Sequence, residues 1–286
     1  MSADIGAAAD TLIRLELETD IGDGDRTGEW TIPADAVGRA RIMAKEDGVA
    51  CGVAIAARTF ETVDPELEVV AHVGDGTRLA SGVVVMGVAG SLRSILSAER
   101  TALNFLARLS GVATLTARYV EAVAGTGCRI SDTRKTTPGW RSLEKHAVAT
   151  GGGMNHREGL YDMVLIKENH IRAASGVRKA IEAARSGARR EGLELEVEVT
   201  NEIELREALS CGPDRVMLDN MTLAELEAAV SIVRAGALPH PQIEASGGVK
   251  LDTVRDIAGT GMDYISVGAL THSAPALDFS LLVTNR

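Results

Sequence analysis

The chain has 286 residues, 45% of them hydrophobic, which is enough for one large α/β domain or two domains with sizeable cores. A net charge of −10 argues against a nucleic-acid or anionic-membrane binder, which would carry a basic excess. No apolar run approaches the ~18–20 residues of a membrane span, and the first residues lack the features of a signal peptide. Cys51, Cys128 and Cys211 form no metal-ligand spacing, so we expect three buried thiols and a cytoplasmic protein.

The first 110 residues predict a small α+β domain built on an antiparallel sheet. Apolar residues at helical spacing predict a helix over 4–19, and the Asp- and Gly-rich stretch that follows predicts a loop. That loop lacks the glutamate of a calcium site, because position 31 is threonine. The further expected elements are strands at 38–46, 67–73 and 78–88 and helices at 53–63, 91–109 and 112–124.

After Gly127 the pattern changes to alternating strands and helices, which is typical of βαβ units and a parallel sheet. Strands are expected at 128–132, 163–167, 193–199, 215–219, 242–246 and 263–267, and helices at 176–191, 202–211, 222–235 and 250–259. A piece around 146–151 could be a further strand or a helix end. Six or seven repeats without a dinucleotide fingerprint favour a closed barrel over an open sheet.

Cationic side chains gather where two of these strands end. Arg134 and Lys135 follow the first strand, Lys167 ends the second, and His156 and Arg157 lie in the glycine-rich segment between them. Active sites of α/β barrels lie at the carboxyl ends of the strands. In an acidic protein, this concentration of cations predicts a pocket for a ligand with several negative charges.

Carboxylates are expected beside these cations. In strand 193–199, Glu194, Glu196 and Glu198 alternate with leucine and valine, so the glutamates should face the barrel lumen. A buried carboxylate needs a partner, and Lys167 on the neighbouring strand is the natural one. The alternative is a Lys–Glu pair with a purely structural role. Asp219, at the end of the next strand, favours a functional role for the pair.

The last two strands end in small residues that suit a phosphate group. Ser246, Gly247 and Gly248 follow one strand, and Val267, Gly268 and Ala269 follow the other. A helix expected to start at Lys250 lies close by. Phosphate sites of barrels are commonly built from such loops and a helix N-terminus. The residues therefore predict a barrel enzyme for a sugar phosphate and a carboxylate-bearing partner.

The motifs resemble those of the quinolinate phosphoribosyltransferase family over essentially the whole chain. The matching stretches are Asp20-Ile-Gly-Asp-Gly-Asp-Arg-Thr, Glu99-Arg-Thr-Ala-Leu-Asn-Phe, Asp132-Thr-Arg-Lys-Thr, Gly151-Gly-Gly-Met-Asn-His-Arg, Leu165-Ile-Lys-Glu-Asn-His, Glu196-Val-Glu-Val, Leu218-Asp-Asn and Ser266-Val-Gly-Ala-Leu-Thr. The resemblance implies an incomplete TIM-like α/β barrel of six or seven parallel strands, preceded by a smaller α+β open-faced sandwich domain. The domains implied are 1–110, joined by the returning segment 275–286, and 111–274.

The resemblance also implies an activity and its residues. Such an enzyme transfers phosphoribosyl from phosphoribosyl pyrophosphate (PRPP) to quinolinate and releases carbon dioxide and pyrophosphate, leaving nicotinate mononucleotide for NAD synthesis. Lys167, Glu196 and Asp219 are the implied catalytic residues, and Mg²⁺ would be held mainly through PRPP, without dedicated protein ligands. The implied quinolinate-binding residues are Arg134, His156, Arg157 and Lys167, with Thr133 and Lys135 beside them. The implied 5′-phosphate loops are Ser246–Gly248 and Val267–Ala269. Arg100 would come from a neighbouring subunit, which implies a homodimer or higher oligomer with a shared active site.

Three other functions remain open at this point. A paralogue associated with molybdate transport is disfavoured by the intact Asn155-His-Arg and Lys167-Glu-Asn-His stretches. A nicotinate phosphoribosyltransferase would need fewer cations for a single carboxylate. A non-catalytic anion-binding protein of the same fold would have no need of Glu196 and Asp219.

Overall fold

The computed structural model describes residues 3–236 and 238–284, which form two compact units. The first unit contains the chain up to Ala117, residues Thr136–Gly152 and the chain from Leu270 on, and the second contains Arg118–Lys135 and Gly153–Ala269. The units divide the chain differently from the predicted domains, because residues 136–152 belong to the first unit.

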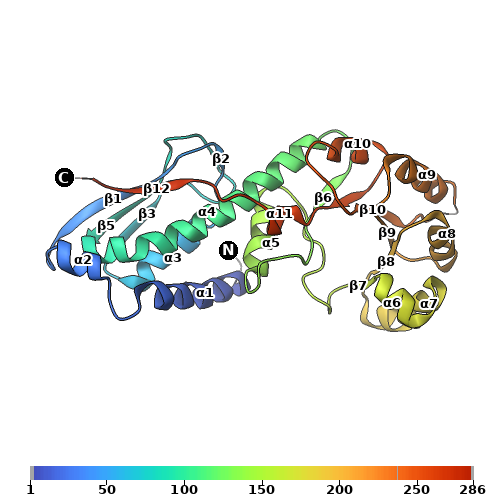
Figure 1. The fold of residues 1–286 in the computed structure, drawn as a ribbon, viewed down its shortest axis with the longest axis horizontal. Coiled ribbons are helices and arrows are strands. Elements are labelled where there is room, and N and C mark those ends of the chain that lie inside the picture. Colours follow the sequence, from blue (N-terminus) through green and yellow to red (C-terminus); the bar gives the residue numbers. More distant parts are fainter. Residues whose placement is uncertain (1–2, 237, 285–286) are drawn as a thin grey trace. The chain divides into compact units, whose positions relative to one another are not determined.

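The first unit is built on a four-stranded antiparallel sheet in the order β12-β1-β5-β3 (Figure 1). Its strands are β1 (Val37–Ala44), β3 (Glu68–Ala71), β5 (Val84–Ser91) and β12 (Phe279–Thr284), and the short strands β2 (Gly48–Val49) and β4 (Arg78–Leu79) pair separately. Its helices are α1 (Ala3–Ile21), α2 (Arg26–Thr31), α3 (Val53–Val63) and α5 (Arg141–Thr150), and α4 (Leu92–Ala122) begins here. Side chains of the sheet pack with α3 and α4 around fully buried Ile42, Phe60 and Ile95.

The segment from 136 to 152 is held to the first unit by a buried carboxylate. Glu144 is completely buried and accepts hydrogen bonds from the Arg108 guanidinium (2.7 Å) and the Thr137 hydroxyl (2.8 Å). A buried carboxylate is stable only when it is paired in this way. The strand–helix alternation of the sequence could not reveal these contacts, so it did not assign α5 to the first unit.

One long helix replaces the two helices expected over 91–109 and 112–124. Gly111 lies between the two expected helices, and α4 runs through it without interruption. A Cβ at this position would lie 2.0 Å from the carbonyl oxygen of Pro275. Gly111 therefore serves the close approach of a returning segment rather than the end of a helix.

The second unit contains six parallel strands in the order β6-β11-β10-β9-β8-β7, with helices outside them (Figure 1). The strands are β6 (Arg129–Ser131), β7 (Val164–Ile166), β8 (Leu195–Val199), β9 (Arg215–Asp219), β10 (Gln242–Ser246) and β11 (Tyr264–Ser266). The helices are α6 (Glu168–Ala174), α7 (Val177–Glu191), α8 (Glu202–Cys211), α9 (Leu223–Arg234), α10 (Val254–Gly259) and α11 (Ala269–His272), whose last residues belong to the first unit.

The barrel is incomplete, as the family resemblance implied, and the closed barrel favoured by the repeat count alone is wrong. Within the described residues β6 and β7 are not paired with each other. Instead, Met154 forms an isolated parallel bridge to Ser131 on the free side of β6. The undecided piece at 146–151 is the end of α5. The helix expected to start at Lys250 begins at Val254, after a turn in which Val254 N–H bonds to the Lys250 carbonyl.

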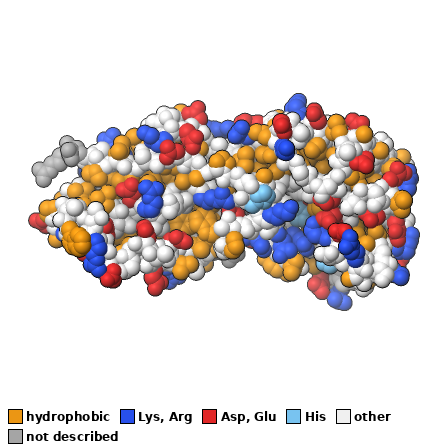
Figure 2. Space-filling view, viewed as in Figure 1, with side chains coloured by type: hydrophobic (Ala, Val, Ile, Leu, Met, Phe, Trp, Pro, Cys, Tyr) orange, Lys and Arg blue, Asp and Glu red, His pale blue; other side chains and the backbone are white. Residues whose placement is uncertain are grey.

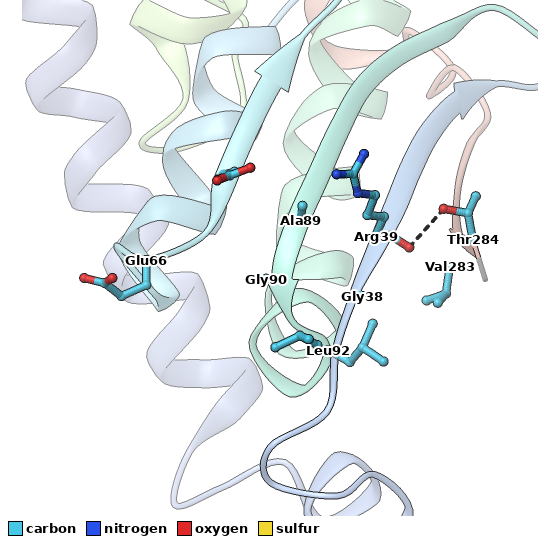
Figure 3. Close-up of a pocket in the computed structure, with 10 residues that line it drawn as sticks. Gly38, Arg39, Glu66, Ala89, Gly90, Leu92, Val283 and Thr284 are labelled. Carbon is cyan, nitrogen blue, oxygen red and sulfur yellow. Dashed lines mark hydrogen bonds between the residues drawn. The ribbon is translucent and has the colours of Figure 1, made fainter. Parts of the chain in front are cut away.

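No helix among residues 3–236 and 238–284 is long and apolar enough to cross a membrane. A hollow of about 730 Å³ lies over the first sheet, between β1, β5, β12 and the segment around Glu66 (Figure 3). Its rim is tied by the Thr284 hydroxyl, which donates to the Arg39 carbonyl. Val37 and Val283 line it and are well exposed, so this side of the sheet is open.

The three cysteines are unpaired, and they differ in burial. Cys51 and Cys128 are buried as expected, whereas Cys211 is half-buried, so the expectation of three buried thiols is wrong for Cys211. Cys51 lies near Asp75 and His146, a grouping that sequence spacing did not indicate. His146 Nε2 is 2.9 Å from the Asp75 carboxylate, which also accepts the Val53 N–H.

We expect a thiol-specific reagent to modify only Cys211 in the native protein. Burial, together with the charge of Asp75, raises the pKa of Cys51 far above its ordinary value, and burial raises the pKa of Cys128 to about 12. Since the thiolate is the reactive form, both should react only after unfolding. Counting modified thiols by mass spectrometry checks this, with Cys211→Ser as the control that should take no label. Fast labelling of a second thiol would contradict it.

Candidate active site

A cavity of about 510 Å³ lies within the second unit, at the carboxyl ends of its parallel strands. Strand direction explains its position, because parallel strands bring all their C-terminal loops to one edge. Ten of the predicted site residues line it: Thr133, Arg134, Lys135, His156, Arg157, Lys167, Asp219, Ser246, Gly247 and Gly248. Figure 2 shows Lys and Arg side chains gathered beside Asp and Glu side chains on this half of the molecule.

The cations come from the segments after β6 and before and after β7. Arg157 is half-buried and donates to the Met163 carbonyl at 3.3 Å. Its pKa is lowered by burial and by the neighbouring charge of Arg134. Arg134 Nε is buried without a hydrogen-bond partner in the described structure. The two guanidiniums repel each other, and one of them has an unsatisfied donor. Binding of an anion here would therefore lower the free energy of the site.

Lys167 pairs with one of the three glutamates of the predicted strand 193–199, as expected, and the partner is Glu198. Lys167 keeps 44% of its side chain exposed, whereas Glu198 keeps 11%. Lys167 is also the residue before α6, and its backbone N–H donates to His170 Nδ1 at 3.0 Å. The backbone is therefore fixed while the ammonium group remains accessible from the cavity.

Glu196, predicted as a catalytic residue, does not line the cavity and is completely buried. Its carboxylate faces His156 Nε2 at 3.1 Å, and its Oε1 atom has no hydrogen-bond partner among the described residues. Burial raises its pKa to about 7. Glu194, which was expected to share the lumen, is 36% exposed and pairs with Arg215 at 3.2 Å.

A hydrogen bond joins the loop after β9 to the end of β10. Asn220 N–H donates to the Ser246 carbonyl at 2.9 Å, and the Asn220 amide donates to Asp219 at 2.6 Å. Gly247 has a φ of +92°, and a Cβ there would lie 2.3 Å from the Asn220 side chain. Glycine is thus required, and its small size leaves backbone open to the cavity.

The chain is similar to proteins of one family along nearly its whole length. The models of the N-terminal and C-terminal domains of quinolinate phosphoribosyl transferase match residues 25–110 and 112–282. The chain is 43% identical to a probable carboxylating nicotinate-nucleotide pyrophosphorylase of Synechocystis, covering 96% of this chain and 92% of the relative. It is 42% identical to the Mycobacterium leprae carboxylating enzyme, covering 96% of each. The structure of the Francisella tularensis nicotinate-nucleotide pyrophosphorylase superimposes with a TM-score of 0.91 at 38% identity, covering 97% of this chain and 96% of that one.

The chain belongs to the quinolinate phosphoribosyltransferase family.

Five residues that the family resemblance implied do not line this cavity: Arg100, Glu196, Val267, Gly268 and Ala269. Arg100 is exposed on α4 in the first unit. Val267 is buried and donates its N–H to the Ser131 carbonyl, and Gly268 and Ala269 do not line the cavity either. Ser266, one position earlier, lines it instead.

Sequence reasoning missed several lining residues of this quinolinate phosphoribosyltransferase homologue, namely Leu165, Met217, Asn220, Glu244 and Ser266. Glu244 is the most informative of them, since it is completely buried and burial raises its pKa to about 7. A signal was present, because Glu244 stands between apolar Ile243 and Ala245 in a strand, just as Glu196 stands between Leu195 and Val197.

The donor atoms around the cavity indicate where a magnesium ion would fit. His156, Glu196 and Glu244 bring three donor atoms within 4.8 Å of one another. However, His156 Nδ1 accepts the Arg157 N–H at 2.8 Å, so the ring proton of a neutral imidazole is on Nε2, which is then a donor and not a ligand. Mg²⁺ prefers oxygen ligands and keeps several waters. Asp219, half-buried in the cavity wall, fits a hydrated ion of this kind.

Proposed function

We propose that this protein transfers the phosphoribosyl group of PRPP to the ring nitrogen of quinolinate, with loss of carbon dioxide, to give nicotinate mononucleotide and pyrophosphate for NAD synthesis. Family membership over the whole chain supports this activity, and so does the cation cluster. The observation that carries the substrate assignment is the pair Arg134 and Arg157, two close guanidiniums facing one cavity. Quinolinate carries two carboxylates, and guanidinium groups bind carboxylates through charge-assisted, bidentate hydrogen bonds.

The exposure of each side chain indicates its role in binding quinolinate. Arg134, Arg157 and Lys167 line the cavity and bind the dicarboxylate, with Thr133 and Lys135 beside them. His156 keeps only 5% of its side chain exposed and turns Nε2 to Glu196, so it orients that carboxylate and contacts the ligand only at its margin.

Glu196 and Asp219 stabilise the ribose as the pyrophosphate leaves. When the bond from C1′ to the pyrophosphate oxygen breaks, its electron pair leaves with pyrophosphate and positive charge develops on the ribose ring. Carboxylates held in a dry site stabilise such a charge without reorganising. The quinolinate nitrogen then forms the new bond to C1′. Carbon dioxide leaves from the ring carbon beside that nitrogen, the electron pair of the broken C–C bond stays on this carbon next to the positive charge, and a proton from water takes the place of the lost carboxylate.

We assign the 5′-phosphate to the loops Ser246–Gly248 and Val267–Ala269, with the first as the principal contact because it lines the cavity. Mg²⁺ bound through pyrophosphate would neutralise the leaving group, with Asp219 as an outer contact through water. Three unpaired cysteines fit a reducing compartment, and we propose a cytoplasmic location on that basis.

The function is tested by measuring carbon dioxide and nicotinate mononucleotide formation from quinolinate, PRPP and Mg²⁺. Nicotinate is the control substrate. Turnover of quinolinate alone is the expected result. Turnover of nicotinate instead would mean that the cation cluster serves a single carboxylate. Binding of PRPP without any turnover would favour a non-catalytic anion-binding protein or the transport-associated paralogue.

We further propose a homodimer or higher oligomer in which Arg100 completes the quinolinate site of a second subunit. Arg100→Ala should then raise the KM for quinolinate, although Arg100 does not line the cavity of its own chain. Mixing Arg100→Ala with Arg134→Ala subunits should restore activity, since one of the resulting mixed sites has both arginines. Subunit exchange is verified by mass spectrometry of differently tagged chains. Exchange without any recovery would contradict the shared site.

A further inference from the structure

Three side chains of the kinds that bind transition metals come together in the first unit. They are Cys51, just before α3, Asp75, in the turn between β3 and β4, and His146 on α5. The Cys51 sulfur, one carboxylate oxygen of Asp75 and one ring nitrogen of His146 all lie within 4.8 Å of one another. None of the three residues lines the candidate active site, and the proposed phosphoribosyl transfer makes no use of them.

The Asp75 carboxylate is the centre of this cluster. Its Oδ2 atom is 2.9 Å from His146 Nε2 and 3.9 Å from Cys51 Sγ. Its Oδ1 atom accepts the Val53 N–H, at the first residue of α3, at 3.0 Å. The backbone thus holds one carboxylate oxygen and turns the other toward a thiol and an imidazole. Thiol, imidazole and carboxylate are the side chains that bind Zn²⁺ in proteins.

The backbone at Cys51 is fixed against α4. The Cys51 N–H donates to the Ser110 hydroxyl oxygen at 3.0 Å, and the Ser110 hydroxyl donates to the Cys51 carbonyl at 3.1 Å. Gly52 has a φ of +86°, and a Cβ there would lie 2.8 Å from the Leu109 side chain, so this loop passes close to the helix. A ligand on a fixed backbone loses little conformational freedom when it binds an ion.

We propose that Cys51, Asp75 and His146 bind one Zn²⁺ ion, with a water molecule as the fourth ligand. In a tetrahedral zinc site, with bonds of about 2.0–2.3 Å, the ligand atoms are roughly 3.3–3.6 Å apart, so the cluster reaches this geometry by shifts of about 1 Å. Cys51 is completely buried, whereas Asp75 and His146 keep 26% and 22% of their side chains exposed. The ion and its water therefore enter from the side of Asp75 and His146.

Coordination replaces two protons by the ion. A carboxylate only accepts hydrogen bonds, so His146 Nε2 carries the proton in its contact with Asp75. This proton and the thiol proton of Cys51 pass to the solvent when nitrogen and sulfur bind the metal. A thiolate beside Asp75 is unfavourable without a cation, and the charge of Zn²⁺ removes that repulsion. Mg²⁺ does not replace Zn²⁺ here, because it takes oxygen ligands.

The first test is spectroscopy with Co²⁺ as the probe, which needs no turnover and is therefore independent of the proposed function. Full-length protein without a tag is freed of metal with a chelator and titrated with Co²⁺. One equivalent should produce a sulfur-to-cobalt charge-transfer band in the near ultraviolet and the intense visible bands of tetrahedral cobalt. Zn²⁺ should displace Co²⁺ and abolish both, whereas excess Mg²⁺ should not. A wild type that shows neither band would overturn the proposal.

The second test uses variants to locate the ion. Cys51→Ser should lose the charge-transfer band, and Cys51→Ser and His146→Ala should each bind Zn²⁺ about a hundredfold more weakly in competition with a chromophoric chelator. Cys211→Ser is the matched thiol control, since Cys211 is half-buried and lies outside the cluster. His156→Ala is the matched imidazole control, since His156 belongs to the donors at the candidate active site. Both controls should bind Zn²⁺ as the wild type does.

The same variants also define the results that would contradict the proposal. Zn²⁺ binding lost in His156→Ala but retained in His146→Ala would place the ion at the candidate active site and overturn it. Zn²⁺ should also raise the Tm of the wild type by several degrees and leave that of Cys51→Ser unchanged, because a ligand stabilises only the fold that binds it. If Cys51→Ser or His146→Ala fails to fold, the wild-type cobalt spectrum and the two control variants still decide the question.

Discussion

Lys167→Ala is expected to lower kcat/KM for quinolinate by about a thousandfold while the protein stays folded. Lys167 supplies an exposed ammonium group to the cavity, whereas its partner Glu198 is largely buried. Losing the cation therefore removes a contact to the bound dicarboxylate and leaves an uncompensated negative charge near it. Both effects weaken the binding of the dicarboxylate. The lysine backbone is held by its hydrogen bond to His170, so α6 should still form.

Steady-state kinetics and thermal unfolding together check this expectation. Lys179→Ala is a matched control, since Lys179 is an exposed lysine of α7 away from the cavity, and it should change neither quantity. If Lys167→Ala lost its thermal transition altogether, the Lys167–Glu198 pair would be structural, which is the alternative that the sequence left open.

Gly247→Ala is expected to raise the KM for PRPP by about a hundredfold and to lower the free energy of unfolding by about 2 kcal/mol. The added Cβ would lie 2.3 Å from Asn220 Oδ1 and 2.7 Å from the Asn220 backbone nitrogen. Rotation of the Asn220 side chain cannot relieve the second contact. The loop after β9 must move, and with it Asp219 and the proposed phosphate contacts. A φ of +92° adds backbone strain.

Gly248→Ala provides the control for this effect, because it is the next residue along the same loop. Gly248 has a φ of +60°, but a Cβ there meets nothing within 4 Å. It should cost about 1 kcal/mol of stability through backbone strain alone and leave the KM for PRPP within a few-fold of the wild type. Equal losses in the two variants would show that strain, and not the contact with Asn220, limits this loop.

Hydrophobic periodicity was sufficient to predict most elements of the second unit. Strands such as Arg215–Asp219 and Gln242–Ser246 occur where the pattern places them, since a strand of a parallel sheet buried on both faces has few alternatives. The pattern failed where tertiary contacts decide. Two helices were expected where α4 is continuous, and the glycine at 111 is explained by the close approach of the distant Pro275. The start of α10 at Val254 depends on a local turn that propensity does not distinguish from a first helical turn.

The site shows the same division. Strand ends predicted which side chains would share a cavity, because topology alone brings Arg134, Lys167 and Asp219 to one edge. Sequence could not tell which carboxylate pairs with Lys167, since Glu196 and Glu198 lie on the same face of one strand. Glu244 was not predicted, because it lies in the middle of a strand and the site residues were expected at strand ends.

The pairing of β1 with β12 has a consequence for how the protein is made. The hydrogen bond between Thr284 and Arg39 joins positions 245 residues apart. During synthesis, one edge of β1 therefore stays unpaired until residues 279–284 have emerged from the ribosome. Unpaired strand edges can pair with other chains. Deleting the last strand would leave the residues that line the candidate site unchanged, yet we expect the nascent protein to aggregate. Yield in the cell thus depends on residues 279–284, none of which lines the candidate site.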